Sequence, residues 1–476
     1  SPKPPRMSNP TGQGYGNPLI MSAYTFVPHS LKGKKAPLIV MVHEGIHSSF
    51  DTLQNLKAAR ELIQEGYVIV APEYRGSTGY GGNFYDQIDY GGAEIDDTYA
   101  ARNWAVENLP VDPQKVGIIG AGTMGGGIAM SFANAGIAVT LIDVKQEALD
   151  KGLGVIRKNY ENTAKRGGMS EADVSKRMGL IKPSTSLADV KDADVIVEAV
   201  FENTQLKKTV FAEIDRHAKA GAILGTNTST LDIDDIATAT KRPESVIGLH
   251  FFSPANVMRL LEIVPTPQTG AETLATGFAL AARLGKIPVR AGICDGFIGN
   301  RILKRYRAAA EDLLRRGVTP AEVDAAMRGF GLAMGPFEMQ DLAGLDIAFL
   351  QREGARAQGA QVADTLGDIL VRAGRKGQKT GGGWYDYRAG DRTPYPATTV
   401  AELLAPHVRP GERPADIAGY LVAEMAAEGQ AILAEGIAGS PADIDLVEIH
   451  GYGFPRRKGG PMFYAAARQP SDPDLQ

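Results

Sequence analysis

The stretch KVGIIGAGTMGGGIAM (Lys115–Met130) joins a short apolar run, a glycine-rich turn and a helix rich in small residues. Two chemistries use a strand, turn and helix of this kind. One places a nucleophilic serine on the turn, and the other lays a pyrophosphate against the helix N-terminus. A serine nucleophile needs G-x-S-x-G, and the register that begins at Gly120 puts Gly122 where the serine would stand. We therefore predict a phosphate-binding loop.

The glycines of this loop, Gly120, Gly122 and Gly125, follow the pattern G-x-G-x-x-G. The first permits a tight turn, the second lets the backbone approach a pyrophosphate, and the third allows close packing of helix on strand. Asp143 ends the next apolar run, at the spacing expected for a contact with a ribose 2′-hydroxyl. Because a carboxylate repels a 2′-phosphate, we predict NAD as the cofactor. The alternative is a packing turn followed by an ordinary aspartate.

Short apolar runs alternate with amphipathic stretches over much of the chain, which is typical of βαβ units and a parallel sheet. The runs are continuously apolar, so we expect helices to cover both faces of the sheet. The expected strands are Pro37–His43, Tyr67–Glu73, Lys115–Gly120, Ala138–Val144, Ala193–Val200, Ala222–Thr228, Val246–Phe252, Arg259–Pro265 and Lys286–Gly292. We predict an α/β fold with a Rossmann-type doubly wound parallel sheet over residues 115–292.

The sequence that follows is helical and contains an internal repeat. Arg305–Phe337 lines up with Val422–Phe463, since both have a helix, a Pro-Ala-acidic helix start and a glycine-rich end before Gly-Pro. A stretch rich in Pro and Thr, Arg388–Thr399, reads as a linker between the copies. We predict two tandem all-α domains, 293–390 and 391–476, that pack about a pseudo-two-fold axis.

Composition excludes several classes of protein. With 43% hydrophobic and 22% charged residues the chain is globular, and a net charge of -4 gives no reason to expect nucleic acid as a partner. No apolar run reaches membrane-spanning length, and the first residues lack the apolar stretch of a secretion signal. The single cysteine, Cys294, excludes an internal disulfide. We expect a cytoplasmic protein without nucleic acid, membrane insertion or a metal site.

One histidine among seven has the position of a catalytic base. In GLHFFSPANVMRLLEIV, His250 ends an apolar strand, where open α/β sheets bind their ligands, and Glu262 lies in the next strand. An imidazole held by a carboxylate can remove a hydroxyl proton while a hydride leaves the same carbon. The alternative is a buried structural histidine.

Six motifs resemble the 3-hydroxyacyl-CoA dehydrogenases of fatty-acid β-oxidation: VGIIGAGTMGGGIA, VEAVFEN, TNTSTL, GLHFFSPANVMRLLEIV, DGFIGNRIL and GPFEMQDLAGLDI. The helical duplication is similar to the dehydrogenase half of the multifunctional β-oxidation enzymes. The resemblance covers residues 115–467. It implies an NAD-dependent enzyme that oxidises (S)-3-hydroxyacyl-CoA to 3-ketoacyl-CoA, with acyl-CoA as its substrate.

The resemblance also implies roles for single residues. His250 would be the general base and Glu262 its orienting partner, while Ser229 and Asn300 would hydrogen-bond the substrate oxygen. Ser229 could instead, or in addition, cap a helix N-terminus, and Asn300 could be a helix cap.

The same resemblance assigns a cofactor site. Its residues are Gly120, Gly122, Thr123, Met124, Gly125, Asp143, Glu202, Lys207, Asn227 and Ser229. Glu202 and Lys207 would touch the ribose on the nicotinamide side. Ser253 departs from the family pattern, because relatives often have Asn there. The basic stretch Arg157–Gly168 is a candidate for binding the phosphates of CoA.

Residues 1–114 resemble a different family, the prolyl-oligopeptidase-like serine hydrolases, up to the strand that delivers the nucleophile. The resemblance stops at that strand, and Glu44 in VHEGIH departs from the usual His-Gly-Gly segment. Residues 115–120 suit both families, so the chain changes family on one shared strand. We expect a partial α/β-hydrolase-like segment whose strands extend or lean on the Rossmann sheet.

Other functions and assemblies stay open at this point. The alternatives are a serine hydrolase or peptidase of the prolyl-oligopeptidase type, for which we find no nucleophile, and an inactive fusion. The tandem helical domains allow either a homodimer or a monomer in which the second copy replaces a partner subunit.

Overall fold

The computed structural model describes residues 20–32, 35–36, 38–43, 48–64, 66–80, 82–86, 97–98, 100–101, 104–105, 108–109, 115–357, 359 and 361–468. The chain forms two compact units, residues 1–115 with 136–138 and residues 116–135 with 139–476. Among the described helices, none combines the length and apolar character that crossing a bilayer requires.

The second unit contains an eight-stranded sheet. Its strands, in sheet order, are β11 (Ile287–Arg290), β10 (Leu260–Pro265), β9 (Val246–Phe251), β8 (Ile223–Thr226), β7 (Val195–Glu198), β4 (Lys115–Ile119), β5 (Ala138–Ile142) and β6 (Ile181–Ser184). From β6 to β9 this is the doubly wound order 3-2-1-4-5-6. The chain therefore reverses direction across the sheet between β4 and β7, and the carboxyl ends of these strands form the crevice where such sheets bind ligands.

Two features of this sheet differ from expectation. β10 runs antiparallel to β9, because the short link between them leaves no room for a parallel crossover. The sheet is therefore mixed rather than wholly parallel. β6 was not expected, since it is short, polar and contains Pro183. A proline is tolerated there because β6 is an edge strand.

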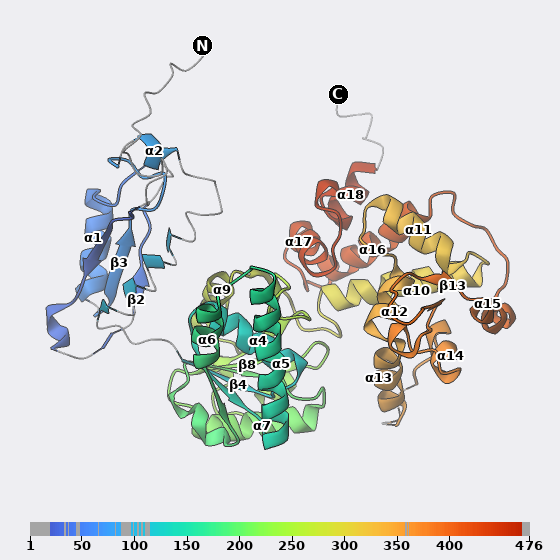
Figure 1. Cartoon of the computed structure of the whole chain (residues 1–476), viewed down its shortest axis with the longest axis horizontal. Helices are drawn as coiled ribbons and strands as arrows, with labels where there is room; N and C mark the ends of the chain where they lie inside the picture. The colour runs from blue at the N-terminus through green and yellow to red at the C-terminus, as the bar shows by residue number, and fades with distance from the viewer. Residues whose placement is uncertain are drawn as a thin grey trace, which may run out of the picture. The chain divides into compact units, whose positions relative to one another are not determined.

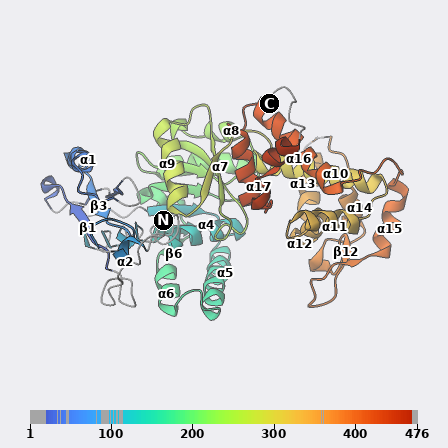
Figure 2. The ribbon, with the colours of Figure 1, turned by 90° about the horizontal axis from the view of Figure 1, so that it is seen from above.

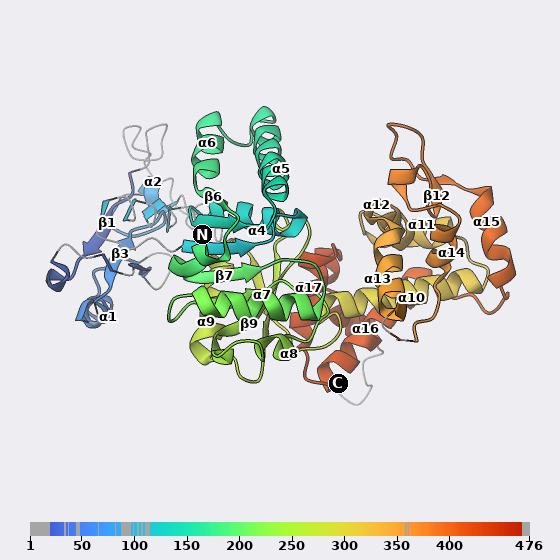
Figure 3. The same cartoon turned by 90° about the horizontal axis from the view of Figure 1, so that it is seen from below.

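Helices lie on both sides of the sheet. They are α4 (Thr123–Asn134), α5 (Gln146–Lys165), α6 (Glu171–Gly179), α7 (Thr204–His217), α8 (Ile233–Ala237) and α9 (Ala271–Arg283). In Figures 1 and 3 the strands lie between α4 and α7. The pair α5 and α6 extends away from the sheet, as Figures 2 and 3 show.

The first unit is built on β3 (Val68–Pro72), which is buried along its whole length. β1 (Ala23–Phe26) pairs with β3 antiparallel, β2 (Leu38–Val40) pairs with it parallel, and α1 (Leu53–Gln64) packs against it. These strands form a sheet of their own, so the expectation that they extend the larger sheet is wrong, whereas the alternative that they lean on it remains a prediction. Because β4 has β5 and β7 as neighbours, neither of its edges is free for another strand.

The C-terminal region is helical. Its helices are α10 (Gly299–Arg315), α11 (Pro320–Phe330), α12 (Pro336–Ala343), α13 (Leu345–Ala357), α14 (Leu366–Arg372), α15 (Thr398–Leu404), α16 (Ile417–Ala434), α17 (Pro441–Gly451) and α18 (Pro461–Arg468). The repeat pairs α10 to α12 with α16 to α18. In the first copy Asp324 accepts hydrogen bonds from the backbone N–H groups of Phe337 (3.0 Å) and Glu338 (3.1 Å). In the second copy Asp445 does the same for Met462 (2.8 Å) and Phe463 (3.1 Å).

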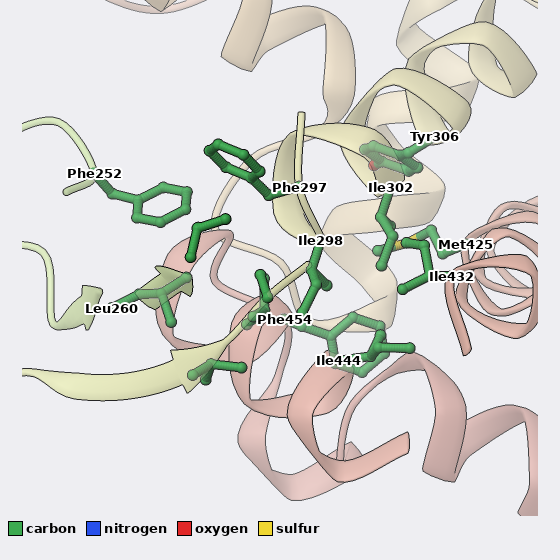
Figure 4. Close-up of a cluster of buried hydrophobic side chains, with 14 of the residues drawn as sticks. Phe252, Leu260, Phe297, Ile298, Ile302, Tyr306, Met425, Ile432, Ile444 and Phe454 are labelled. Carbon is green, nitrogen blue, oxygen red and sulfur yellow. The ribbon is translucent and has the colours of Figure 1, made fainter. Parts of the chain in front are cut away.

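Both helical copies share one hydrophobic core with the sheet. Figure 4 shows Phe252 and Leu260 from the sheet region in the same cluster as Ile302 of α10, Ile432 of α16 and Ile444 of α17, with Phe297 and Ile298 between them. α10 and α16 lie side by side (Figure 2). Truncating one such buried side chain costs about 2–5 kcal/mol, so this core holds α10 firmly against the sheet. The predicted domain boundaries, 114/115, 292/293 and 390/391, remain predictions.

Candidate active site

The glycine loop at the end of β4 has the shape that a bound pyrophosphate requires. Gly120 has φ 102°, and a Cβ there would lie 2.7 Å from the carbonyl oxygen of Ala199. A Cβ on Gly125 would lie 1.8 Å from the oxygen of Gly120, whereas one on Gly122 would meet nothing within 4 Å. α4 begins at Thr123 without a side-chain cap. No side chain therefore occupies its first N–H groups, and the loop fits the pyrophosphate of NAD.

Asp143 lies beside this loop, at the carboxyl end of β5. Its Oδ2 accepts a hydrogen bond from the backbone N–H of Ala121 (3.0 Å), and its Oδ1 accepts one from the backbone N–H of Lys145 (3.2 Å). The carboxylate is thus held next to the predicted pyrophosphate position, as a contact with an adenosine ribose requires.

His250 and Glu262 face each other across β9 and β10. They are direct cross-strand partners, and Nδ1 of His250 lies 2.6 Å from Oε2 of Glu262. Oε1 of Glu262 accepts hydrogen bonds from the backbone N–H groups of Ile298 (3.2 Å) and Gly299 (3.0 Å), where α10 begins. Both carboxylate oxygens are therefore occupied. Nε2 of His250 has no protein partner among the described residues and remains available to a ligand.

A cavity of about 950 Å³ joins the sheet region to the first helical copy. The predicted site residues that line it are Met124, Glu202, Asn227, Ser229, His250 and Asn300. Ser253 lines it as well, and Asn227 is fixed by its Oδ1, which accepts from the backbone N–H of Phe251 (2.8 Å). The fold thus brings together residues that lie far apart in the sequence and belong to five of the motifs.

Glu202 organises the loop after β8. Its Oε1 accepts hydrogen bonds from Oγ1 of Thr228 (2.7 Å) and from the backbone N–H of Ser229 (2.8 Å). Burial raises the pKa of Glu202, but the charge of Lys207 and these hydrogen bonds outweigh it and leave the pKa lowered. Ser229 is not a helix cap, because the side chain of Asp232 caps α8.

Lys207 lies behind the cavity wall rather than in it. Its side chain is 1% exposed, and Nζ lies 2.7 Å from Glu198 and 3.4 Å from Glu202. In this arrangement Lys207 holds Glu202 in place, and its direct contact with the cofactor remains a prediction. Glu198 was missed by the sequence analysis, although a carboxylate at the end of the apolar run ADVIVEAV is the kind of signal that could have identified it.

Asn300 is inside α10, whose N-cap is Ile298, so it is not a cap. Oη of Tyr452 donates a hydrogen bond to its Oδ1 (2.8 Å), which leaves Nδ2 as the donor that can face a ligand. Burial raises the pKa of Tyr452 well above its usual range, so the hydroxyl keeps its proton. A Cβ on Gly299 would lie 2.5 Å from the Tyr452 ring. Glycine at this position therefore lets Tyr452 approach the start of α10.

Tyr452 is a second residue that sequence analysis missed. The repeat aligns it with Phe330 of the first copy, and the difference of one hydroxyl was the available signal. The basic stretch 157–168 belongs to α5 and the turn after it and does not line the cavity, so its contact with CoA remains a prediction.

In the first unit, a buried histidine and serine are neighbours. Nε2 of His43 lies 2.8 Å from Oγ of Ser77, and Ser77 is fully buried. Because Ser77 is buried, its Oγ is not exposed to a substrate in this arrangement. Glu44 lies outside the described residues.

Comparisons with known families match the same two parts of the chain to the same two families as the motifs do. Residues 115–294 match the NAD binding domain of 3-hydroxyacyl-CoA dehydrogenase, and residues 296–387 match the C-terminal domain of the same enzyme. Residues 54–138 match the prolyl oligopeptidase family. The first and third matches overlap on β4 and α4, which confirms that two resemblances meet on a shared strand.

Individual relatives agree with the family matches. A peroxisomal bifunctional enzyme of Danio rerio is 42% identical over 377 residues, which cover 75% of this chain and 52% of the relative. A 3-hydroxybutyryl-CoA dehydrogenase of Escherichia coli K12 has a TM-score of 0.65 at 28% identity, covering 75% of this chain and 92% of that one. An (S)-3-hydroxybutyryl-CoA dehydrogenase of Ralstonia eutropha has a TM-score of 0.52 at 34% identity, covering 58% of this chain and 100% of that one. The chain spans about half the length of the curated relatives it matches.

Proposed function

This chain belongs to the 3-hydroxyacyl-CoA dehydrogenase family and carries its NAD-binding domain, and from that premise we propose that it oxidises (S)-3-hydroxyacyl-CoA to 3-ketoacyl-CoA in fatty-acid β-oxidation. The observation that carries the proposal is the His250–Glu262 pair, 2.6 Å apart, on the wall of a cavity that also contains Met124 of the glycine loop.

The proton of the substrate hydroxyl passes to Nε2 of His250. Nδ1 carries the other ring proton and donates a hydrogen bond to Glu262 throughout, and the negative charge of Glu262 stabilises the imidazolium that forms. Because Glu262 is itself held by two backbone N–H groups, the ring keeps its orientation while it changes charge. NAD⁺, when bound, supplies the acceptor for the hydride that leaves C3.

The substrate oxygen needs a donor as its proton leaves. Nδ2 of Asn300 fits this task, because Tyr452 occupies Oδ1. Oγ of Ser229 donates to Glu202 (3.2 Å), so in this arrangement Ser229 shapes the wall beside the oxygen rather than supplying the main donor. Gly120, Gly122, Gly125 and Asp143 would hold the cofactor, together with the backbone of Thr123.

The reverse reaction tests this proposal directly. We expect the protein to consume NADH in the presence of acetoacetyl-CoA, followed by absorbance, and His250→Ala to lose most of that activity. The variant should still bind NADH in calorimetry, since His250 is outside the glycine loop. A wild-type protein that binds NADH but leaves acetoacetyl-CoA unchanged would contradict the proposal.

We further propose that the protein is a monomer in which the second helical copy replaces a partner subunit, and that it works in the cytoplasm. The contact from Tyr452 to Asn300 supports the first statement, because the second copy of the same chain reaches the site. The lone Cys294 supports the second. Light scattering that gives twice the mass of one chain would contradict the first, and cell fractionation tests the second.

A further inference from the structure

Lys286 is a buried cation at the edge of the sheet, between α9 and β11. Its Nζ donates hydrogen bonds to the backbone carbonyl of Ala255 and, over 2.6 Å, to that of Met258. Within the described part of the chain no acidic side chain pairs with it, and burial lowers the pKa of Lys286 to about 8. A buried ammonium without a counter-ion is costly, so these two carbonyls are what stabilises its charge in the described residues.

Both carbonyls belong to the β9–β10 loop, residues 252–259, which follows the strand of His250. The loop begins with Phe252 and Ser253, and both line the cavity. The ring centroids of Phe252 and His250 are 4.3 Å apart. Lys286 therefore holds the loop that forms the cavity wall beside the imidazole.

The carbonyl of Ala255 also joins this loop to α4, the helix that begins in the glycine loop. Oγ of Ser131 donates a hydrogen bond to it (3.0 Å). A Cβ on Gly127, one turn earlier on the same face of α4, would lie 3.1 Å from Cβ of Ala255, so helix and loop are in direct contact. One carbonyl oxygen thus accepts from the helix that would hold the cofactor and from the lysine at the sheet edge.

We propose that Lys286 is a positioning residue: together with Ser131 it fixes the β9–β10 loop against α4, so that the wall beside His250 and the pyrophosphate site keep one relative position. Lys286 does not line the cavity and therefore acts through the loop rather than on the substrate. Hydride transfer depends steeply on the distance and orientation of the reacting groups, which gives this contact its effect on rate. The inference rests on the proposed dehydrogenase function.

Single-turnover kinetics test the inference. Protein saturated with NADH is mixed with acetoacetyl-CoA, and NADH absorbance is followed by stopped flow. Lys286→Met should lower the rate constant of NADH oxidation by roughly 10- to 100-fold, the effect of a displacement of about 1 Å at the reacting groups. The Kd of NADH in calorimetry should stay as in wild type, because the glycine loop is intact. A merely structural lysine would lower the amplitude, which counts active molecules, and leave the rate constant unchanged.

The matched control is Lys219→Met. Nζ of Lys219 pairs with Asp194 (2.6 Å) at the surface, and its side chain does not line the cavity. We expect this variant to keep the wild-type rate constant and amplitude.

A double-mutant cycle tests whether the two donors act through the same carbonyl. Ser131→Ala alone should change the rate constant little, because Lys286 still holds Ala255. In the Lys286→Met background the same substitution should lower it by roughly a further five-fold, since groups that share a partner are not additive. An equal effect of Ser131→Ala in both backgrounds would overturn the inference.

Gly127→Ala perturbs the same contact with the lysine in place, and it decides the question if Lys286→Met does not fold. The added methyl group would press on Ala255, which two donors hold, so the rate constant should fall. Gly126→Ala, whose Cβ would lie 3.7 Å from the side chain of Ile156, should keep it. A wild-type rate constant in folded Lys286→Met or in Gly127→Ala would overturn the inference. A wild type that binds NADH but does not turn over acetoacetyl-CoA would instead refute the proposed dehydrogenase function.

Discussion

The Nδ1 atom of His250 lies 2.6 Å from Oε2 of Glu262, and the other oxygen of that carboxylate accepts two backbone N–H groups at the start of α10. The Glu262 carboxylate thus links β10 to the imidazole of His250 and to the first turn of α10. Asn300 is the next residue of that helix. The relative position of base and oxygen donor is therefore set by a single side chain that is fully buried.

Replacing Glu262 by Gln tests this connection. A glutamine offers one acceptor oxygen where the structure uses two, so either His250 or the backbone of Ile298 and Gly299 loses its partner. We expect kcat to fall by roughly 100-fold, within the range of general-base effects, while NADH binding in calorimetry is retained. Glu272→Gln, an exposed change on α9, serves as control. A wild-type kcat in Glu262→Gln would show that the carboxylate does not orient the base.

Two neighbouring glycines provide a matched test of the cofactor loop. A Cβ on Gly125 would lie 1.8 Å from a backbone oxygen, whereas one on Gly126 would lie 3.7 Å from the side chain of Ile156, an ordinary contact. We expect Gly125→Ala to weaken NADH binding in calorimetry by roughly ten-fold or more, which corresponds to about 1.4 kcal/mol. Gly126→Ala should bind as wild type does. Equal affinities in both variants would contradict a loop that depends on this close approach.

Tyr452→Phe gives the second helical copy the residue found in the first. Without the hydroxyl, the amide of Asn300 can rotate, and its Nδ2 no longer has a fixed direction. We expect kcat to fall by roughly 5- to 10-fold, the value of one neutral hydrogen bond, with little change in KM. Tyr464→Phe is the control, because that hydroxyl accepts only from Arg468 at the surface of α18. A loss of stability without a change in kcat would show that Tyr452 has only a packing role.

Sequence alone predicted those features of the fold and the site whose pattern lies within one short stretch of residues. The glycine loop and the strands of the parallel sheet are local patterns, and His250 and Glu262 could be paired because consecutive strands lie side by side. The contact of Tyr452 with Asn300 spans 152 residues and depends on how α17 packs, which no local pattern reports. The burial of Lys207 could not be predicted for a similar reason, since it depends on the contact of this α7 side chain with Glu198 of β7. The sequence analysis did not predict β6, because an edge strand need not be apolar.

The buried carboxyl group of Asp324 makes the free energy of unfolding fall as pH rises, which an exposed aspartate would not do. It is fully buried and accepts hydrogen bonds from two backbone N–H groups and from Oη of Tyr385 (2.6 Å). Burial raises the pKa of Asp324 to about 7, and the hydrogen bonds offset this only in part. The folded protein therefore binds a proton between about pH 4 and 7 that the unfolded chain releases.

From this we expect the unfolding free energy of the helical region to fall as pH rises from about 4 to 7, by up to roughly 4 kcal/mol from this group. Asp324→Asn, which resembles the protonated acid, should flatten that profile. Urea unfolding, followed by the fluorescence of Trp384 in a variant that lacks Trp104, measures this free energy. Trp384 reports on the region around Asp324 because it is buried beside Phe337. Glu272→Gln should keep the wild-type profile. If Asp324→Asn kept the same dependence on pH, another group in this region would have to bind the proton.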